Sequence, residues 1–322
     1  MRIHLKAAVI SALCILSAGA AVAQSSAPPR LTIASGPVSG GWYPMAGVLG
    51  ELIEKAYPDT NVTVTTGGGV ENLPKVAGGL ADVGFTQSDI YAASRSGTAP
   101  FEQKVPGVAA LGYLGFVPQA FFLVKEGSDY TTIEDLVAKK KAIRLVVPPR
   151  NNGGELIVRR LFEQMGVTYD DIESWGGNIA FMGYSEASGL IGDGHADAYV
   201  GPVIGGIQEL ITQQKMRLMP WPEATIDAVL PAGYGKQTIP ADKWYFVTQD
   251  VTVPVLKNIL IVPEKMDPGF AGGLAKVLAI HPDEIRQSAA MFGSFSADNL
   301  PDVAGGPLHP GAEAYYRSMD SK

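Results

Sequence analysis

The chain has 322 residues, of which 46% are hydrophobic, and a formal net charge of −7. This length is sufficient to bury a core, divided between two lobes, and the acidic balance argues against a nucleic-acid partner and against a basic membrane-binding patch. The only cysteine, Cys14, lies near the N-terminus. We therefore expect no disulfide, no thiol nucleophile and no cysteine metal ligand in the rest of the chain.

The first residues have the composition of a secretory signal peptide. Two basic residues precede an apolar stretch, residues 7–20, which is too short to span a membrane, and an Ala-Val-Ala triplet before Gln24 matches a cleavage site. We expect residues 1–23 to be removed on export to the periplasm. Residues 24–30 are polar and proline-rich and are expected to form a flexible leader. No later stretch is long enough for a membrane span, so no direct membrane insertion is expected.

A strand, a glycine-rich loop and a helix follow the leader in this order. Leu31–Ser35 is an apolar run, and Pro44–Ala56 carries apolar residues at helical spacing. Asn61–Thr66 alternates and is rich in β-branched residues, which favours a second strand. A short helix over Val70–Gly78 and a strand over Asp82–Phe85 complete this unit. The alternation of strands and helices indicates an α/β lobe with a mainly parallel sheet.

The same order returns later in the chain. The strand Ile143–Val147 leads through a second glycine-rich loop into the helix Glu155–Met165. Ahead of this repeat, Thr132 is followed three residues later by Asp135, a pattern that predicts a capped helix start. The other expected elements are two apolar strands and two helices: Ala120–Lys125, Asn258–Pro263, Gly269–Ile280 and Pro282–Met291.

More than a hundred residues follow the second repeat, so the chain does not divide into two consecutive halves. We expect a discontinuous first lobe, residues 31–125 plus 257–322, and an inserted second lobe, residues 126–256. The strands near Ala120–Lys125 and Val251–Val262 would cross between the lobes and act as a hinge. Two α/β lobes joined in this way predict a ligand cleft between them.

Each repeat would direct a helix N-terminus at this cleft. Unpaired N–H groups and the positive end of the helix dipole make such a terminus a site for an anion. Small residues allow the backbone to approach a ligand, and aromatic or amide side chains nearby add walls and hydrogen bonds. The candidate ligand-binding residues are Ser39, Gly40, Gly41, Trp42, Tyr43, Gln87, Ser88, Arg150, Asn152, Gly153, Gly154, Tyr184, Ser185 and Gly201.

Several of these residues have an alternative structural interpretation. The first loop is also compatible with an ordinary tight turn beside core aromatic residues. Ser88 or Asp89 is as well suited to capping a helix as to contacting a ligand. Arg150 suits either a bidentate grip on a carboxylate or a solvated loop, and Tyr184 either a ligand contact or core packing.

Five short motifs resemble, in their order, the TAXI family, the extracytoplasmic solute-binding subunits of TRAP transporters. They are residues 33–36 (IASG), 39–44 (SGGWYP), 71–73 (ENL), 80–84 (LADVG) and 307–312 with the tyrosine pair that follows (PLHPGA and YY). The resemblance implies a type II periplasmic-binding-protein fold that closes over one organic anion, a dicarboxylate or an acidic amino acid. It also implies a partner, the TRAP membrane permease, which is driven by an ion gradient and not by ATP.

One loop departs from that family. Where the family usually has a Ser-Gly-Thr core, this chain has Asn152-Gly153-Gly154. The change removes two hydroxyl donors and adds an amide, with the guanidinium of Arg150 nearby.

Two other function classes remain open from the sequence. The chain is also compatible with a binding protein that serves an ABC importer or a sensor kinase. An exported serine hydrolase would use Ser185, in a segment that nearly matches a nucleophile elbow, with His281 or His309 as the base. The histidines show no metal-ligand spacing. We expect no enzymatic activity, no cofactor, no metal and a monomeric protein.

Overall fold

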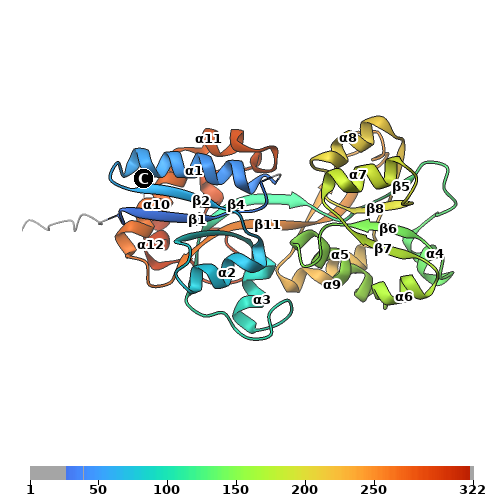
Figure 1. The fold of residues 1–322 in the computed structure, drawn as a ribbon, viewed down its shortest axis with the longest axis horizontal. Coiled ribbons are helices and arrows are strands. Elements are labelled where there is room, and N and C mark those ends of the chain that lie inside the picture. Colours follow the sequence, from blue (N-terminus) through green and yellow to red (C-terminus); the bar gives the residue numbers. More distant parts are fainter. Residues whose placement is uncertain (1–26, 39, 320–322) are drawn as a thin grey trace, which may run out of the picture.

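The structure is a computed structural model, which describes residues 27–38 and 40–319. Two lobes lie side by side and are connected by long strands (Figure 1). The expected signal peptide, residues 1–23, and the start of the leader lie outside the described residues. Of the helices in the described ranges, none combines the length and hydropathy that a membrane span needs.

The first lobe is built mostly from the two ends of the chain. Its strands are β1 (Arg30–Ala34), β2 (Asn61–Thr65), β3 (Val83–Gln87), β4 (Val108–Pro118) and the second half of β11 (Val251–Pro263). Its helices are α1 (Trp42–Ala56), α2 (Gly69–Ala77), α3 (Ser88–Ser96), α10 (Pro268–Ile280), α11 (Pro282–Ser288) and α12 (Pro310–Met319).

The second lobe contains the middle of the chain. Its strands are β5 (Phe121–Lys125), β6 (Arg144–Val147), β7 (Asn178–Phe181), β8 (Ala198–Gly201), β9 (Met216–Met219) and β10 (Gly235–Ile239), which pairs with the first half of β11. Its helices are α4 (Ile133–Ala138), α5 (Gly153–Gln164), α6 (Tyr169–Ser174), α7 (Tyr184–Gly192), α8 (Gly206–Gln213) and α9 (Glu223–Val229).

Helices cover both faces of each sheet. In the first lobe, α1, α10, α11 and α12 contribute to one core cluster, and α2 and α3 contribute to the cluster on the other face. In the second lobe, α4, α5, α6 and α9 cover one face, and α7 and α8 cover the other. The apolar faces predicted for the helices after the two glycine-rich loops are buried, as Met45, Ile53 and Leu161 illustrate.

The sheets are mixed and not mainly parallel. In the first, β1 is parallel to β2 and β3, but β11 is antiparallel to β3, β4 and β10. In the second, β6 is parallel to β7 and β8, but β5 is antiparallel to β8 and β9. The expectation of mainly parallel sheets was therefore wrong. One strand next to a crossing runs against the βαβ strands in each sheet: β11 in the first sheet and β5 in the second.

Two segments cross between the lobes. The strand β11 begins with Val251 and Val253 in a core cluster of the second lobe and ends with Leu260 and Val262 in the core of the first. The other crossing lies between β4 and β5, where Ala120 has a φ of 57°, in the left-handed region that non-glycine residues rarely adopt. Figure 1 shows β4 and β11 running from one lobe toward the other.

The crossing before β5 differs from the sequence expectation. Residues 121–125, which the sequence assigned to the first lobe, pair with β8 and β9 in the second sheet. An apolar run identifies a strand, but it does not identify the sheet that the strand joins. The chain therefore reaches the second lobe before Phe121.

Candidate functional site

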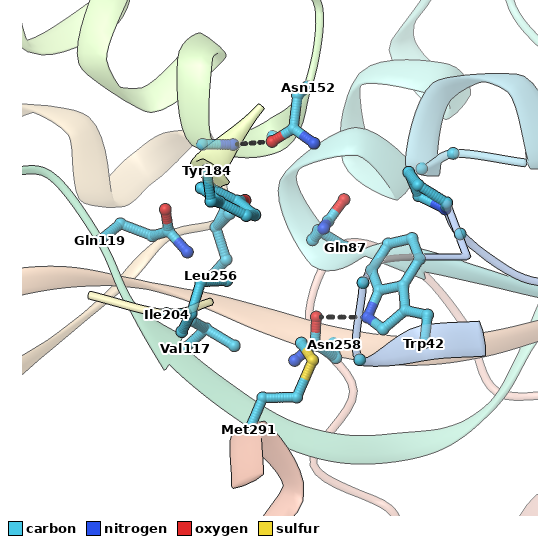
Figure 2. A pocket seen from close by; sticks show the side chains of 18 residues that line it. Trp42, Gln87, Val117, Gln119, Asn152, Tyr184, Ile204, Leu256, Asn258 and Met291 are labelled. Carbon is cyan, nitrogen blue, oxygen red and sulfur yellow. Dashed lines mark hydrogen bonds between the residues drawn. The ribbon is translucent and has the colours of Figure 1, made fainter. Parts of the chain in front are cut away.

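A cavity of about 110 Å³ lies between the two lobes (Figure 2). This volume holds several water molecules or one small organic ligand. The lining residues come from both lobes and from both crossing segments: Gly36, Pro37, Gly40, Gly41, Trp42, Gly68, Gly69, Gln87, Val117, Gln119, Asn152, Gly153, Gly154, Tyr184, Ile204, Leu256, Asn258 and Met291.

Four helices begin at this cavity. In the first lobe, α1 begins after Gly41 and α2 begins after Gly68, and neither glycine provides a side-chain cap. In the second lobe, α5 begins after Asn152 and α7 begins at Tyr184. The first backbone N–H groups of a helix have no partner within the helix, so these starts provide hydrogen-bond donors near the cavity.

The glycines at three of these helix starts lie close against other side chains. A Cβ atom on Gly41 would collide with the sulfur of Met291, and one on Gly69 would collide with the side-chain oxygen of Gln87. On Gly153 a Cβ would lie 3.2 Å from the same Gln87 side chain. Because Gly153 and Gln87 belong to different lobes, the lobes are in close contact here, which is the closed arrangement of a two-lobe protein.

The start of α5 is capped by its own residues. The Asn152 side-chain oxygen accepts a hydrogen bond of 2.8 Å from the Gly154 N–H. The buried carboxylate of Glu155 accepts a hydrogen bond of 2.8 Å from the Asn151 N–H and lies 3.2 Å from Arg159 Nε. These contacts already satisfy part of the donor capacity of the second-lobe loop.

Trp42 and Asn258 form the floor of the first-lobe side. The indole Nε1–H of Trp42 donates a hydrogen bond of 3.3 Å to Asn258 Oδ1, drawn as a dashed line in Figure 2. Asn258 is only 1% exposed, and its Nδ2 has no hydrogen-bond partner among the residues that the structure describes. A buried amide nitrogen without a partner is costly, which makes it a candidate contact for a bound molecule.

Two glutamines at the cavity also have a side-chain amide atom without a hydrogen-bond partner among the described residues. Gln119, 4% exposed, lies in the crossing segment between β4 and β5, and Gln87 ends β3. The side-chain oxygens of both are buried and have no hydrogen-bond partner within the described part of the chain. Figure 2 shows both side chains at the edge of the same space as Trp42 and Tyr184. The cavity therefore gathers three amide side chains, each with one buried polar atom whose hydrogen-bonding capacity is unused.

Tyr184 provides a phenol on the second-lobe side. Its removal from water raises the pKa of Tyr184 to about 12. The phenol therefore stays protonated at neutral pH and can both donate and accept a hydrogen bond.

Eight of the residues that the sequence singled out line the cavity. Five others do not line it: Tyr43, Ser88, Arg150, Ser185 and Gly201. Ser39 lies outside the described residues. The lining residues among the candidates are Gly40, Gly41, Trp42, Gln87, Asn152, Gly153, Gly154 and Tyr184.

The structure gives other roles to three of the five residues outside the lining. Ser88 is fully buried, and its hydroxyl donates a hydrogen bond of 2.9 Å to the Gly233 carbonyl. The Arg150 guanidinium lies 3.9 Å from the centre of the Phe181 ring, a cation–π contact. A Cβ atom on Gly201 would collide with the Tyr199 hydroxyl, so this glycine serves strand packing.

The sequence missed ten lining residues: Gly36, Pro37, Gly68, Gly69, Val117, Gln119, Ile204, Leu256, Asn258 and Met291. The run Gly67-Gly68-Gly69 before α2 was visible in the sequence as the end of a strand, and its place before a helix was the available signal. The residues on the crossing segments gave no such signal, since they lie within the long strands β4 and β11 or, like Gln119, in the short link between β4 and β5.

A second set of contacts joins the lobes beside the cavity. Leu156 of α5 is 3% exposed and packs in a core cluster of the first lobe. One turn further along α5, Arg160 Nη1 lies 3.3 Å from Asp89 Oδ2 of α3 and also donates a hydrogen bond to the Tyr234 hydroxyl. Burial raises the pKa of Asp89 to about 6, although the charge of Arg160 acts in the opposite direction.

The described residues provide no cluster for a metal ion. Within residues 27–38 and 40–319, no three histidine, cysteine, aspartate or glutamate side chains come together in a ligand arrangement. His309, one of the possible bases of a hydrolase, is 1% exposed, and its Nδ1 accepts a hydrogen bond of 3.2 Å from the Gly311 N–H. This contact gives His309 a structural role in the first lobe.

Two solved structures share this fold at low sequence identity. PhnD1 from Prochlorococcus marinus, in complex with methylphosphonate, is 14% identical, with a TM-score of 0.58 over 92% of this chain and 100% of that chain. MatC from Rhodopseudomonas palustris, with bound malate, is 11% identical, with a TM-score of 0.55 over 91% and 99%. At these identities the similarity concerns the fold, the two-lobe α/β fold of periplasmic binding proteins.

The family comparison covers almost the whole chain. Residues 33–319 match the NMT1-like family, a range that begins within β1, ends with α12 and includes every lining residue of the cavity. Because this match extends over both lobes and the crossing segments between them, the chain belongs to the NMT1-like family.

Proposed function

We propose that this protein is a periplasmic solute receptor of a TRAP-type secondary transporter. It closes its lobes over one small organic anion and delivers the anion to the membrane permease. The observation that carries the proposal is the cavity between the lobes, at which helices of both lobes begin and three amide side chains have unused hydrogen-bonding capacity. Helix N-termini and buried amides are suited to holding an anion away from water.

Closure follows from the division of the lining between the lobes. A ligand that contacts α1 and α2 on one side and Tyr184 and Gln119 on the other makes its full set of contacts only when the lobes are together. Binding therefore shifts the population from an open to a closed arrangement. PhnD1 and MatC, with the same fold, have small anions bound, and this agrees with an anionic ligand here.

The TRAP assignment rests on the ordered motifs of the chain. Residues 39–44 and 80–84 resemble the TAXI family; of these, residues 42–44 begin α1 and residues 83–84 begin β3. A receptor for an ABC importer would have the same cavity, so the permease has to be tested directly. The decisive property is the energy source of uptake, an ion gradient or ATP.

The test of the receptor uses thermal unfolding with a panel of organic acids. A ligand that binds only the folded state raises the melting temperature by mass action. We expect at least one small anion to raise it by several degrees at about a hundred times its dissociation constant, a stabilisation of about 2.7 kcal/mol. An unchanged melting temperature across the whole panel would contradict the proposal.

The test of the transport class uses uptake of the labelled ligand by cells that express this chain with its permease. A protonophore or sodium ionophore should abolish uptake while cellular ATP is maintained. Uptake that survives the loss of the ion gradient and stops when ATP is depleted would assign the receptor to an ABC importer instead.

A further inference from the structure

The described part of the cavity lining has no charged side chain that could balance the charge of a ligand. Of the described residues that line it, none carries a formal charge at neutral pH. The nearest candidate cation from the sequence, Arg150, lies against Phe181 and is not among the lining residues. The charge of an anion in this cavity is therefore balanced by helix dipoles and by neutral hydrogen-bond donors.

The helix starts at the cavity are electrostatically unequal. In the second lobe, α5 has the Asn152 cap and Glu155 in its first turn, and α7 has Glu186 in its first turn. In the first lobe, α2 has Glu71 in its first turn, whereas α1 has neither a side-chain cap nor an acidic residue there. Acidic side chains in the first turn offset the positive end of a helix. The start of α1 is thus the most favourable position for a negative charge.

Asn258 supplies an independent indication of the same position. The indole of Trp42 is only a donor, so its hydrogen bond fixes the Asn258 oxygen toward Trp42 and directs Nδ2 away from it. This nitrogen is buried and has no partner in residues 27–38 and 40–319. It belongs to a residue that lines the cavity next to the first residue of α1. A carboxylate at the start of α1 would satisfy it.

The rest of the lining suits an uncharged polar group. Gln119, Gln87 and Tyr184 each donate and accept hydrogen bonds, as a hydroxyl or an amide does. These residues offer no carboxylate to pair with an ammonium group. A second carboxylate on the second-lobe side would approach the starts of α5 and α7. The positive ends of these helix dipoles are already offset by Glu155 and Glu186.

We infer that the ligand is a small organic monoanion: its one charged group lies at the start of α1, and its other end is neutral and hydrogen-bonded. This inference rests on the proposed receptor function and narrows it. Dicarboxylates bring a second charge that nothing in the cavity balances, and amino acids bring an ammonium group without a partner. Burying either unpaired charge is costly, so the cavity selects against both classes.

The test compares acids that share a carbon chain and differ at one end. With four carbons, the probes are succinamate, succinate, 4-aminobutyrate and the neutral diamide succinamide, and equivalent sets cover two to five carbons. Isothermal titration calorimetry of the mature protein measures each dissociation constant. We expect the best monoanion with a neutral polar end to bind at least about tenfold more tightly than its dicarboxylate, amino acid and neutral counterparts.

The outcomes separate this inference from the function on which it rests. A dicarboxylate or amino acid that binds as tightly as the matched monoanion overturns the inference and leaves a receptor for organic anions. If no probe in any set binds at about 10 mM, a free energy weaker than about 3 kcal/mol, both proposals fail.

A charge variant tests the electrostatics of the cavity. Gln119→Glu keeps the shape of the side chain and adds a carboxylate at the lining. We expect it to weaken binding of the monoanion by about tenfold or more and to strengthen binding of 4-aminobutyrate, because the new charge repels one and pairs with the other's ammonium. Equal monoanion affinity in the variant and the unaltered protein would overturn the inference.

The matched control is Gln237→Glu. Gln237 lies on β10, does not line the cavity and also has a buried side-chain oxygen without a partner. The Gln237→Glu variant should leave the affinities for the monoanion and for 4-aminobutyrate unchanged. Thermal unfolding of both variants establishes that they are folded, and the ranking of probes on the unaltered protein tests the inference even if Gln119→Glu does not fold.

Discussion

At the residue scale, the hydrogen bond between Trp42 and Asn258 holds an amide in a fixed orientation. The indole donor lies 3.3 Å from Asn258 Oδ1, and the rings of Trp42 and Phe85 have centroids 5.7 Å apart. The indole is therefore held both by its polar atom and by its ring. A side chain held in this way loses little entropy when a ligand binds beside it.

Replacing Trp42 by phenylalanine should weaken ligand binding more than it destabilises the fold. The substitution keeps a ring but removes the donor that orients Asn258. We expect the dissociation constant to rise about tenfold and the free energy of unfolding to fall by about 1 to 2 kcal/mol. Calorimetric titration and denaturant unfolding measure the two effects separately.

The control for this prediction is Trp221→Phe. The Trp221 indole also donates a buried hydrogen bond, of 2.7 Å, to the Ala120 carbonyl, but Trp221 does not line the cavity. The Trp221→Phe variant should lose a similar unfolding free energy to Trp42→Phe and keep the ligand affinity of the unaltered protein. An equal loss of affinity in both variants would mean that Trp42 acts only through overall stability.

The glycine at the start of α1 gives a second prediction at this scale. Gly41→Ala places a methyl group where the sulfur of Met291 lies, at the wall of the cavity. We expect a loss of unfolding free energy of about 1 to 3 kcal/mol and a loss of ligand affinity of about tenfold or more. Denaturant unfolding and calorimetry are again the measurements.

Gly47, within the same helix, is the matched position for comparison. A Cβ on Gly47 would meet nothing within 4 Å. Alanine there should stabilise the protein by about 0.5 to 1 kcal/mol, because glycine is a poor residue for a helix interior, and should leave ligand affinity unchanged. Destabilisation by Gly47→Ala would contradict the packing argument for Gly41.

At the element scale, α5 belongs to the second lobe and also contacts the first lobe. Its first turns place Gly153, Leu156 and Arg160 against the first lobe, where they meet Gln87, a core cluster and Asp89. The spacing of these three residues follows one face of a helix. Closure of the lobes therefore buries an apolar side chain and an ion pair as well as the ligand.

The buried Asp89 predicts a pH dependence of stability. Its pKa is raised from 3.8 to about 6, so the folded protein holds this proton more tightly than the unfolded chain does. The stabilisation is present in full below pH 3.8 and is lost as the pH rises through 6. Relative to Asp89→Asn, the unaltered protein should lose up to about 3 kcal/mol of unfolding free energy between about pH 4 and 7.

Thermal unfolding of both proteins across this pH range provides the measurement. Asp135→Asn is the control, because Asp135 is exposed and its hydrogen bond with Lys139 lowers its pKa. The unfolding free energy of the Asp135→Asn variant should decline between pH 4 and 7 as it does in the unaltered protein. A stability difference between Asp89→Asn and the unaltered protein that does not change with pH would contradict the prediction.

The regular elements were predictable from the sequence, and the crossing strands were not. Helical spacing located α1 and α5 to within two residues at their starts, and the Thr132 side chain accepts the predicted hydrogen bond from the Asp135 N–H, at 3.1 Å. Periodicity is a local property, so it does not reveal that β5 joins the second sheet or that Gln119 and Asn258 meet at one cavity. Those features depend on how the lobes are arranged.

The difference between local sequence patterns and tertiary arrangement also explains which parts of the candidate site were predicted. The starts of α1 and α5 were located because glycine-rich loops mark them, and residues of both starts line the cavity. Arg150 was singled out for its charge, but its guanidinium has a partner, the Phe181 ring, that no spacing in the sequence indicates. Contacts between side chains distant in sequence are set by tertiary packing.

At the scale of the whole molecule, the lobes are in contact, and opening would separate Leu156 and Arg160 from the first lobe. We expect the ligand-free protein to populate an open arrangement in which the cavity is accessible. Small-angle X-ray scattering should then give a smaller radius of gyration with saturating ligand than without it. The same radius in both conditions would contradict closure on binding.

The continuity of β11 constrains how the lobes can move. Residues 251–263 form one strand that pairs with β10 at its start and with β3 and β4 further along, with register shifts near Asn258 and Leu260. A strand shared by both lobes resists sliding of one lobe past the other but allows twisting, so we expect the lobes to move by rotation about a hinge. Substitutions that stiffen β11 should therefore change the rates at which a solute is captured and released, while leaving the open and closed arrangements themselves unchanged.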